Sequence, residues 1–164
     1  MIYYLGLGSN LGDRRLNIRK AGDFLKTVGT VSDISSIYET EPVGMTKDAE
    51  HFYNLVLSLQ CNLPPEDLLK TVKAFEKEMG RDISDSHYKP RIIDIDILLA
   101  GNRIITTESM TVPHKEMHKR GFVLVPLNEI APDVSHPVLN KKIKELLSSF
   151  LSNLDTGEHI RRLK

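Results

Sequence analysis

Hydrophobic positions in the first hundred residues predict four strands and two helices. Ile18, Ala21 and Leu25 recur at the three- to four-residue spacing of a helix. Leu55 and Leu57 instead follow the two-residue alternation of a strand. The predicted strands cover residues 2–7, 31–38, 52–61 and 91–99, and the predicted helices cover residues 14–28 and 64–79.

Cap and turn residues support these boundaries. Asp13 is a suitable N-cap for the first helix, and Gly29 ends it. Pro64 and Pro65 open the second helix, and Gly80 stops it. The order β-α-β-β-α-β is that of the ferredoxin-like motif, so we expect an α+β fold with an antiparallel sheet and both helices on one face.

The last third of the chain is less regular. A short strand is predicted over residues 103–105, followed by short helical pieces and a helix near residues 141–153. The breaks fall at Pro113, Pro126, Pro132 and Pro137. We therefore expect a C-terminal helical extension, within a single domain that covers residues 1–164.

Two long polar segments interrupt the pattern, at residues 39–51 and 81–90. Long connections in a small domain suggest function more than disorder. We expect both loops to lie beside the site.

Asp94 and Asp96 lie in the fourth predicted strand. Alternation gives Ile93, Ile95, Ile97 and Leu99 one face and the two aspartates the other. Their backbones are then about 7 Å apart. Adjacent carboxylates repel each other unless a cation lies near, and Mg²⁺ binds one or two carboxylates together with water and substrate phosphates. The alternative is two carboxylates on a solvated strand face.

Basic residues on both sides of the aspartates favour the first interpretation. Cations beside a metal neutralise charge during phosphoryl transfer. They are Arg81, Lys89 and Arg91 before the pair, and His114, Lys115, Lys119 and Arg120 after it. Each alone is commonly a surface residue, but together they predict a polyphosphate ligand.

An aromatic residue and an amide share one face of the third strand. Phe52 can stack on a flat heterocycle while Asn54 reads its edge. Phe122 is a second aromatic candidate. The alternative is that both aromatic residues belong to the core and that Asn54 ends a strand.

The glycine-containing segment 6–12 does not make a nucleotide-binding loop. Leu11 occupies the third glycine position of the dinucleotide fingerprint, and no Gly-Lys-Ser/Thr follows. We expect residues 8–12 to form a tight turn in which Ser9 and Asn10 offer donors to the site.

Composition narrows the class further. Twenty-two basic residues balance 22 acidic ones, which argues against a nucleic-acid-binding protein with a global positive surface. No stretch approaches the roughly 20 apolar residues of a membrane span, and the N-terminus lacks the features of a signal peptide. The single cysteine, Cys61, excludes an intramolecular disulfide. We expect the cytoplasm.

Together these motifs resemble 6-hydroxymethyl-7,8-dihydropterin pyrophosphokinase of folate biosynthesis. The resemblance covers about residues 2–155, and the segment from Arg91 to His114 is its most specific part. The matching motifs are Gly8-Ser-Asn-Leu11, Tyr38-x-Thr-x-Pro-x-Gly44, Phe52-x-Asn54, Arg91-x-x-Asp-x-Asp96, Val112-Pro-His114 and Arg120-Gly-Phe122.

The resemblance implies transfer of pyrophosphate from ATP to the pterin hydroxymethyl oxygen, with release of AMP, by a monomer. It implies two Mg²⁺ ions at Asp94 and Asp96, and catalytic roles for Arg81 and Arg91. The implied pterin-binding residues are Thr40, Pro42, Val43, Phe52, Asn54 and Phe122. The implied ATP-binding residues are Leu69, Glu76, Arg81, Arg91, Ile97, Thr111, His114 and Arg120.

The sequence also departs from the family pattern. Phe52 stands where some members have Tyr, and His87 and Tyr88 where a bacterial form has Arg and Trp. Ile83 and Lys73 replace polar or basic residues. Two rival interpretations are a metal-dependent nucleotidyltransferase, which would release pyrophosphate, and a ferredoxin-like ligand-sensing module, which would bind without metal.

Overall fold

The structure is a computed structural model that describes residues 1–42, 50–80, 90–153 and 159–163. The main sheet contains β1 (Ile2–Ser9), β2 (Thr30–Ile34), β3 (Tyr38–Thr40), β4 (Phe52–Gln60), β5 (Asp94–Ala100) and β10 (Ile160–Arg162). Its described helices are α1 (Arg14–Val28), α2 (Pro65–Glu78), α3 (Gly121–Ile130) and α4 (Ile143–Ser152), with a 3-10 turn η1 (Met117–Lys119). Two small hairpins join β6 (Ile105–Thr106) to β7 (Thr111–Val112), and β8 (Ser135–His136) to β9 (Lys141–Lys142).

The main sheet is antiparallel, in the order β10-β3-β4-β1-β5, and β2 pairs with the same edge of β4 as β3 does. The single second strand predicted over residues 31–38 is thus wrong. The chain forms two short strands because Ser35 interrupts the ladder. Its backbone N–H donates to Val56, and its hydroxyl accepts the Val56 N–H at 3.0 Å.

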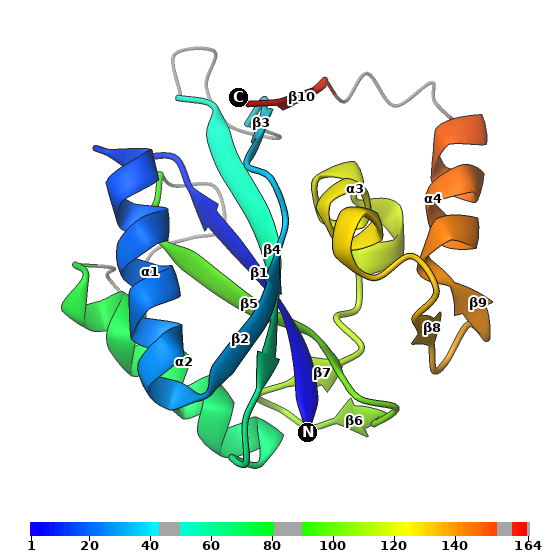
Figure 1. Cartoon of the computed structure of the whole chain (residues 1–164), viewed down its shortest axis with the longest axis horizontal. Helices are drawn as coiled ribbons and strands as arrows, with labels where there is room; N and C mark the ends of the chain where they lie inside the picture. The colour runs from blue at the N-terminus through cyan, green and yellow to red at the C-terminus, as the bar shows by residue number, and fades with distance from the viewer. Residues whose placement is uncertain (43–49, 81–89, 154–158, 164) are drawn as a thin grey trace.

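The first two helices cover one face of the sheet, as Figure 1 shows. The first helix has the predicted bounds, and the Asp13 side chain caps it by accepting the Leu16 N–H. Gly29 follows the helix at a position where a side chain would not fit, because a Cβ there would lie 2.4 Å from the Gln60 carbonyl oxygen. The core on this face is apolar and closely packed, with Tyr3, Leu5, Ile18, Leu25, Leu57, Leu68, Val72 and Ile95 among its members.

The opposite face is partly covered by α3 and α4, which makes a third layer (Figure 1). An irregularity in the pairing of β1 with β5 lets Tyr4 face Leu99 while Leu5 faces Ile97. Leu98 is therefore an extra residue, and Leu99 turns away from Ile97 to pack with Leu124 and Leu127. The prediction that Leu99 shares a face with Ile93, Ile95 and Ile97 is wrong for this reason.

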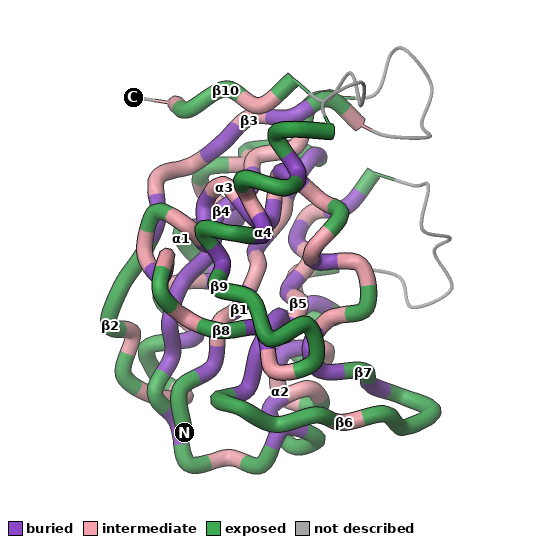
Figure 2. The backbone as a smooth tube through the Cα atoms, turned by 90° about the vertical axis from the view of Figure 1, so that its right-hand side faces the viewer, coloured by how far each residue is buried: buried purple, intermediate pink, exposed green. Residues whose placement is uncertain are grey.

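The C-terminal third has the predicted final helix and a strand that the pattern did not reveal. Helix α3 runs through Pro126, although a break was predicted there, because its buried side chains pack between β4 and α4. Strand β10 adds to β3 at the sheet edge (Figures 1 and 2). Among the described residues, no helix is long and apolar enough to cross a membrane.

Candidate active site

The two aspartates lie on the face of β5 that α1 and α2 leave open. The buried side chains of Ile93 and Ile95 fill the other face, as alternation predicts. Across β1, Asp94 pairs with Gly8 and Asp96 with Gly6. Both aspartates therefore flank a strip of β1 that carries no side chains on this face.

The glycines of β1 separate the aspartates from the amide of Asn54. Gly8 pairs with Asp94 on one side and with Asn54 on the other. Two strand spacings place the backbones of Asn54 and Asp94 about 10 Å apart. A Cβ on Gly8 would lie 3.2 Å from Oδ1 of Asn54, so a larger residue would fill part of the space above the glycine strip. This role was not predicted, although the alternation of Leu5, Gly6, Leu7 and Gly8 in the sequence indicates it.

The predicted pterin residues gather at the Asn54 end of the strip. Nδ2 of Asn54 donates to the Thr40 hydroxyl at 2.8 Å, and both side chains are buried. Phe52 is partly buried, and its ring edge lies 3.8 Å from the Cβ position of Gly8. Phe122 lies in the first turn of α3 and packs on the same sheet face. Pro42 is partly buried and ends its described segment, whereas Val43 lies outside the described residues.

Arg91 is fixed beside the metal-binding candidates. Its Nη1 lies 2.5 Å from Oδ2 of Asp94, and the residue is 9% exposed. Its backbone exchanges two hydrogen bonds with Asn10, whose Oδ1 accepts the Arg91 N–H at 2.7 Å. The tight turn predicted over residues 8–12 is wrong at its start, because β1 extends to Ser9. Ser9 and Asn10 are both buried, and Asn10 holds the backbone of Arg91 beside the site.

His114 and Arg120 approach the pair from the segment that follows β7. The His114 N–H donates to the carbonyl of Leu98, which anchors this segment along β5. Nδ1 of His114 accepts the Glu116 N–H at 3.3 Å, so its ring proton lies on Nε2 and can be donated to a phosphate oxygen. The Arg120 guanidinium lies 5.7 Å from the centre of the Phe122 ring.

The electrostatics of the pair match a cation site. Burial raises the pKa of Asp96, and the charge of Asp94 raises it further, against the opposite influence of Lys73, His114 and Arg120. Burial also lowers the pKa of His114, which favours its neutral form. A cation between the two carboxylates would relieve their repulsion.

The donor set fits Mg²⁺. Within the described residues, the aspartates are not joined by further His, Cys, Asp or Glu side chains into a group of three or more. Two carboxylates leave the remaining octahedral positions to water and phosphate oxygens, which is the usual way in which proteins hold Mg²⁺.

Two side chains of α2 complete the edge of β5. Glu76 is 1% exposed, and its Oε1 accepts the N–H of Ile95 at 2.6 Å. Lys73 donates to the Ile95 carbonyl at 3.2 Å and lies 3.8 Å from Oδ1 of Asp94. No contact was predicted for Lys73, which stood out only as a departure from the family pattern, because it lies far from residue 94 along the chain.

The other predicted nucleotide residues belong to the core, lie on β7 or fall outside the described part of the chain. Ile97 is buried on the α2 side of the sheet, and Leu69 packs against the same core. Thr111 is exposed and begins β7, which lies beside β5. Their contacts with a nucleotide stay predictions. The residues of the 81–90 loop that carried predictions, Arg81, Ile83, His87, Tyr88 and Lys89, lie outside the described residues.

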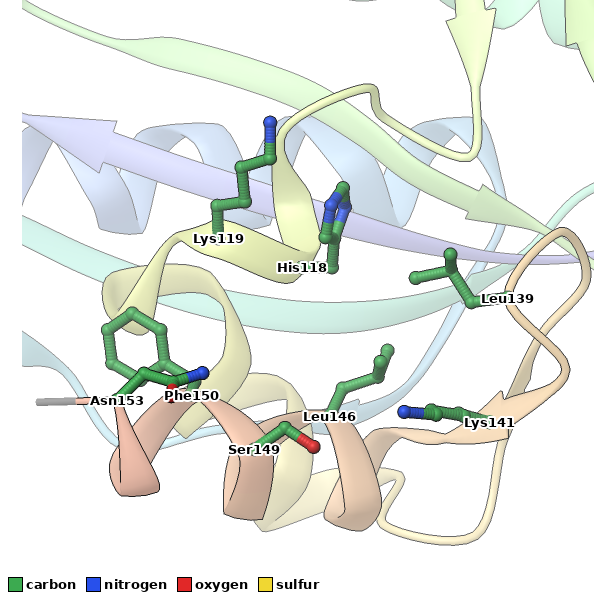
Figure 3. Close-up of a pocket in the computed structure, with 8 residues that line it drawn as sticks. All are labelled: His118, Lys119, Leu139, Lys141, Leu146, Ser149, Phe150 and Asn153. Carbon is green, nitrogen blue, oxygen red and sulfur yellow. The ribbon is translucent and has the colours of Figure 1, made fainter.

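A separate pocket of about 450 Å³ lies between η1 and α4 (Figure 3). His118 and Lys119 line it from η1, and Leu146 and Phe150 from α4. Its lining includes Lys119, one of the cations predicted around the aspartates, and none of the residues implied to bind the pterin or ATP.

An antiparallel sheet that carries a carboxylate pair among cations is the arrangement of a metal-dependent phosphoryl-transfer enzyme. Comparison with known proteins makes this specific. Residues 4–132 match the family of 7,8-dihydro-6-hydroxymethylpterin-pyrophosphokinase. The chain belongs to this family, whose members transfer pyrophosphate from ATP to hydroxymethyldihydropterin in folate biosynthesis.

Two bacterial relatives are similar over most of their length. The 2-amino-4-hydroxy-6-hydroxymethyldihydropteridine pyrophosphokinase of Aquifex aeolicus is 43% identical over 142 residues, 87% of this chain and 88% of the relative. The enzyme of the same name from Bacillus subtilis is 42% identical over 135 residues, 81% of this chain and 80% of the relative. These matches confirm the family that the motifs indicated.

The fold is also similar to solved structures. The crystal structure of Plasmodium falciparum HPPK-DHPS, wild type with pteroate, superposes with a TM-score of 0.75 at 18% identity. The superposition covers 95% of this chain, which spans 43% of that longer one. At this identity the likeness supports the fold alone.

Proposed function

We propose that this chain transfers the β,γ-pyrophosphoryl group of ATP to the hydroxymethyl oxygen of the dihydropterin, with Asp94 and Asp96 as ligands of two Mg²⁺ ions. The observation that carries the site assignment is the bare glycine strip of β1. It separates the carboxylate pair from the Asn54–Thr40 pair on one sheet face. One substrate can bind at each end, with the reacting groups above the strip.

The pterin end recognises a flat, polar ring. Because the Asn54 amide nitrogen already donates to Thr40, its Oδ1 is directed over Gly8 and can accept from the ring N–H groups. Phe52 and Phe122 supply apolar faces for stacking. Pro42 and Val43 would complete this wall.

The nucleotide end neutralises and orients the triphosphate. Bound Mg²⁺ supplies charge neutralisation and a template for in-line displacement. Arg91, anchored by Asn10 and Asp94, and Arg120 supply fixed positive charge, while Nε2–H of His114 donates to a phosphate oxygen. Arg81, Glu76, Leu69, Ile97 and Thr111 are assigned to nucleotide binding on the family resemblance.

Further parts of the proposal concern architecture and setting. We propose the ferredoxin-like plan with a C-terminal helical extension in one domain, supported by the antiparallel order in which β1 lies between β4 and β5. We also propose a monomer in the cytoplasm, on the family resemblance alone.

Calorimetry with a non-hydrolysable ATP analogue tests the site assignment. The wild-type protein should bind the analogue only with Mg²⁺, and the Asp94→Ala variant should lose this Mg²⁺ dependence while remaining folded. Equal binding to both proteins in Mg²⁺ would refute the metal role of the pair.

A further inference from the structure

The C-terminal strand β10 closes the sheet edge beside the pterin end of the site. It pairs antiparallel with β3, with Ile160 opposite Thr40 and Arg162 opposite Tyr38. Figures 1 and 2 show it along β3, at the opposite edge of the sheet from β5. The strand lies beyond residues 4–132, which match the family.

Ile160 also contacts the start of α3. A Cβ built on Gly121 would lie 2.6 Å from Cδ1 of Ile160 and 2.7 Å from Cε1 of Phe150. The α3 backbone therefore packs directly against both side chains at Gly121. Because Gly121 directly precedes Phe122, Ile160 connects Thr40 on β3 to the segment of α3 that carries Phe122.

A second connection lies at the other end of α3, at Glu129. Its carboxylate accepts the Tyr38 hydroxyl at 2.9 Å and the Ser36 N–H at 3.0 Å. Arg162 lies 3.2 Å from the same carboxylate and donates to the Ser36 hydroxyl at 2.8 Å. β10, β3 and α3 are thus joined at both ends of the helix.

We infer that β10 is a positioning element of the pterin pocket, in which Ile160 and Arg162 hold β3 and α3 at the separation that a ring between Asn54 and Phe122 requires. This inference rests on the proposed assignment of the pterin pocket. β10 pairs with β3 and contacts α3, and β5 lies at the other end of the sheet. The loss of β10 should therefore weaken pterin binding and spare Mg²⁺-nucleotide binding.

Single substitutions on β10 test this separation. Ile160→Ala should raise the KM for the pterin roughly 10- to 100-fold, as expected for a displaced binding wall. Arg162→Ala should do so to a smaller extent. The Kd of a non-hydrolysable ATP analogue with Mg²⁺, measured by calorimetry, should change less than about twofold. Ile160→Leu, which keeps the apolar contact, should restore most of the pterin affinity.

Arg161→Ala is the matched control. Arg161 lies on the same strand and pairs with Glu39, which faces Arg14 of α1 on the other side of the sheet. Arg161→Ala should therefore leave the KM for the pterin unchanged.

Asn54→Ala separates the two ways in which the inference can fail. If Asn54→Ala raises the KM for the pterin but Ile160→Ala and Arg162→Ala do not, the role of β10 is overturned and the pocket stands. If none of the three changes it, the pocket assignment is overturned together with the inference. An equal loss of pterin and nucleotide affinity in Ile160→Ala would show a general structural role of β10 and overturn the inference. The inference is also overturned if Ile160→Ala does not fold and Arg162→Ala leaves the KM for the pterin unchanged.

Discussion

The outer sides of β5 and β3 are covered in different ways. At β5, side chains of α2 satisfy the exposed backbone, because Glu76 accepts the Ile95 N–H and Lys73 donates to its carbonyl. At β3, the backbone of β10 does so. Unpaired strand edges must be covered, but only the first solution brings charge next to the aspartates. On the proposed assignment, ionisable side chains therefore surround the metal end, and strand pairing and packing position the pterin end.

Substitution of the aspartates, which lie at the β5 side of this comparison, should have the largest effect on turnover. Asp94→Asn or Asp96→Asn should lower kcat by at least about a thousandfold, since the site loses its stabilisation of phosphate charge. The melting temperature of Asp96→Asn should stay the same or rise, because the amide removes the repulsion that raises the pKa of Asp96. Asp94→Asn should lower it, because this change also weakens the ion pair with the buried Arg91. Turnover assays and thermal unfolding measure both. Turnover within tenfold of wild type would contradict the assignment.

Asn54→Ala should affect the other substrate. If Asn54 binds the pterin edge as proposed, the loss of its buried amide should cost about 1–3 kcal/mol of pterin affinity and leave nucleotide binding unchanged. Ser58→Ala is the matched control, because Ser58 is a buried polar residue of the same strand that bonds to Asp33, away from the site. If both variants raise the KM for the pterin equally, Asn54 has no specific role.

The sequence predicted the parts of the site that depend on local alternation. The common face of Asp94 and Asp96 followed from the strand period, and the bounds of α1 from its spacing and from Asp13. Leu99 was misplaced because the extra residue at Leu98 shows itself only in the pairing with β1. A long apolar run such as Ile97 to Ala100 carries no sign of where the alternation shifts.

The hydrophobic pattern could not predict contacts between segments that are distant in the sequence. Lys73 reaches Asp94 only because α2 packs along the edge of β5. Strand β10 is short and rich in charge, and its assignment depends on β3 beside it. The family resemblance, in contrast, identified the activity, because its motifs preserve residue types whose positions the fold brings together.

Glu76→Ala should have a moderate effect at the β5 edge. It leaves the Ile95 N–H without its acceptor, which should destabilise the fold by about 1–3 kcal/mol. It should also weaken Mg²⁺-nucleotide binding while the KM for the pterin stays near wild type. Chemical denaturation measures the first effect. Glu76→Gln, which keeps an acceptor oxygen, should recover much of the stability, and an equally unstable Gln variant would contradict this reasoning.

We expect the smallest effect in the pH dependence of stability, to which Asp96 on β5 and Glu129 on α3 should contribute with opposite signs. The raised pKa of Asp96, caused first by burial, means that its contribution to stability falls as the pH rises from 3.8 through that pKa. For Glu129, hydrogen bonds from Ser36 and Tyr38 outweigh burial and lower the pKa. Its contribution is therefore present above 4.5 and is lost as the pH falls through the lowered value.

Melting temperatures across acidic pH test these signs. Asp96→Asn should remove the loss of stability that accompanies rising pH, and Glu129→Gln should remove the loss that accompanies falling pH. The same slope in both variants would show that the two carboxyl groups are not in the environments described above. Mg²⁺-dependent nucleotide binding should also weaken on acidification, because protons compete for Asp96.

The most direct test of the central claim is the identity of the products. The protein should be incubated with ATP, Mg²⁺ and 6-hydroxymethyl-7,8-dihydropterin, and the products followed by phosphorus NMR. The proposed function predicts AMP together with the pterin diphosphate, in equal amounts and only when Asp94 and Asp96 are both present. Formation of ADP with a pterin monophosphate, or of AMP with free pyrophosphate and unmodified pterin, would contradict it.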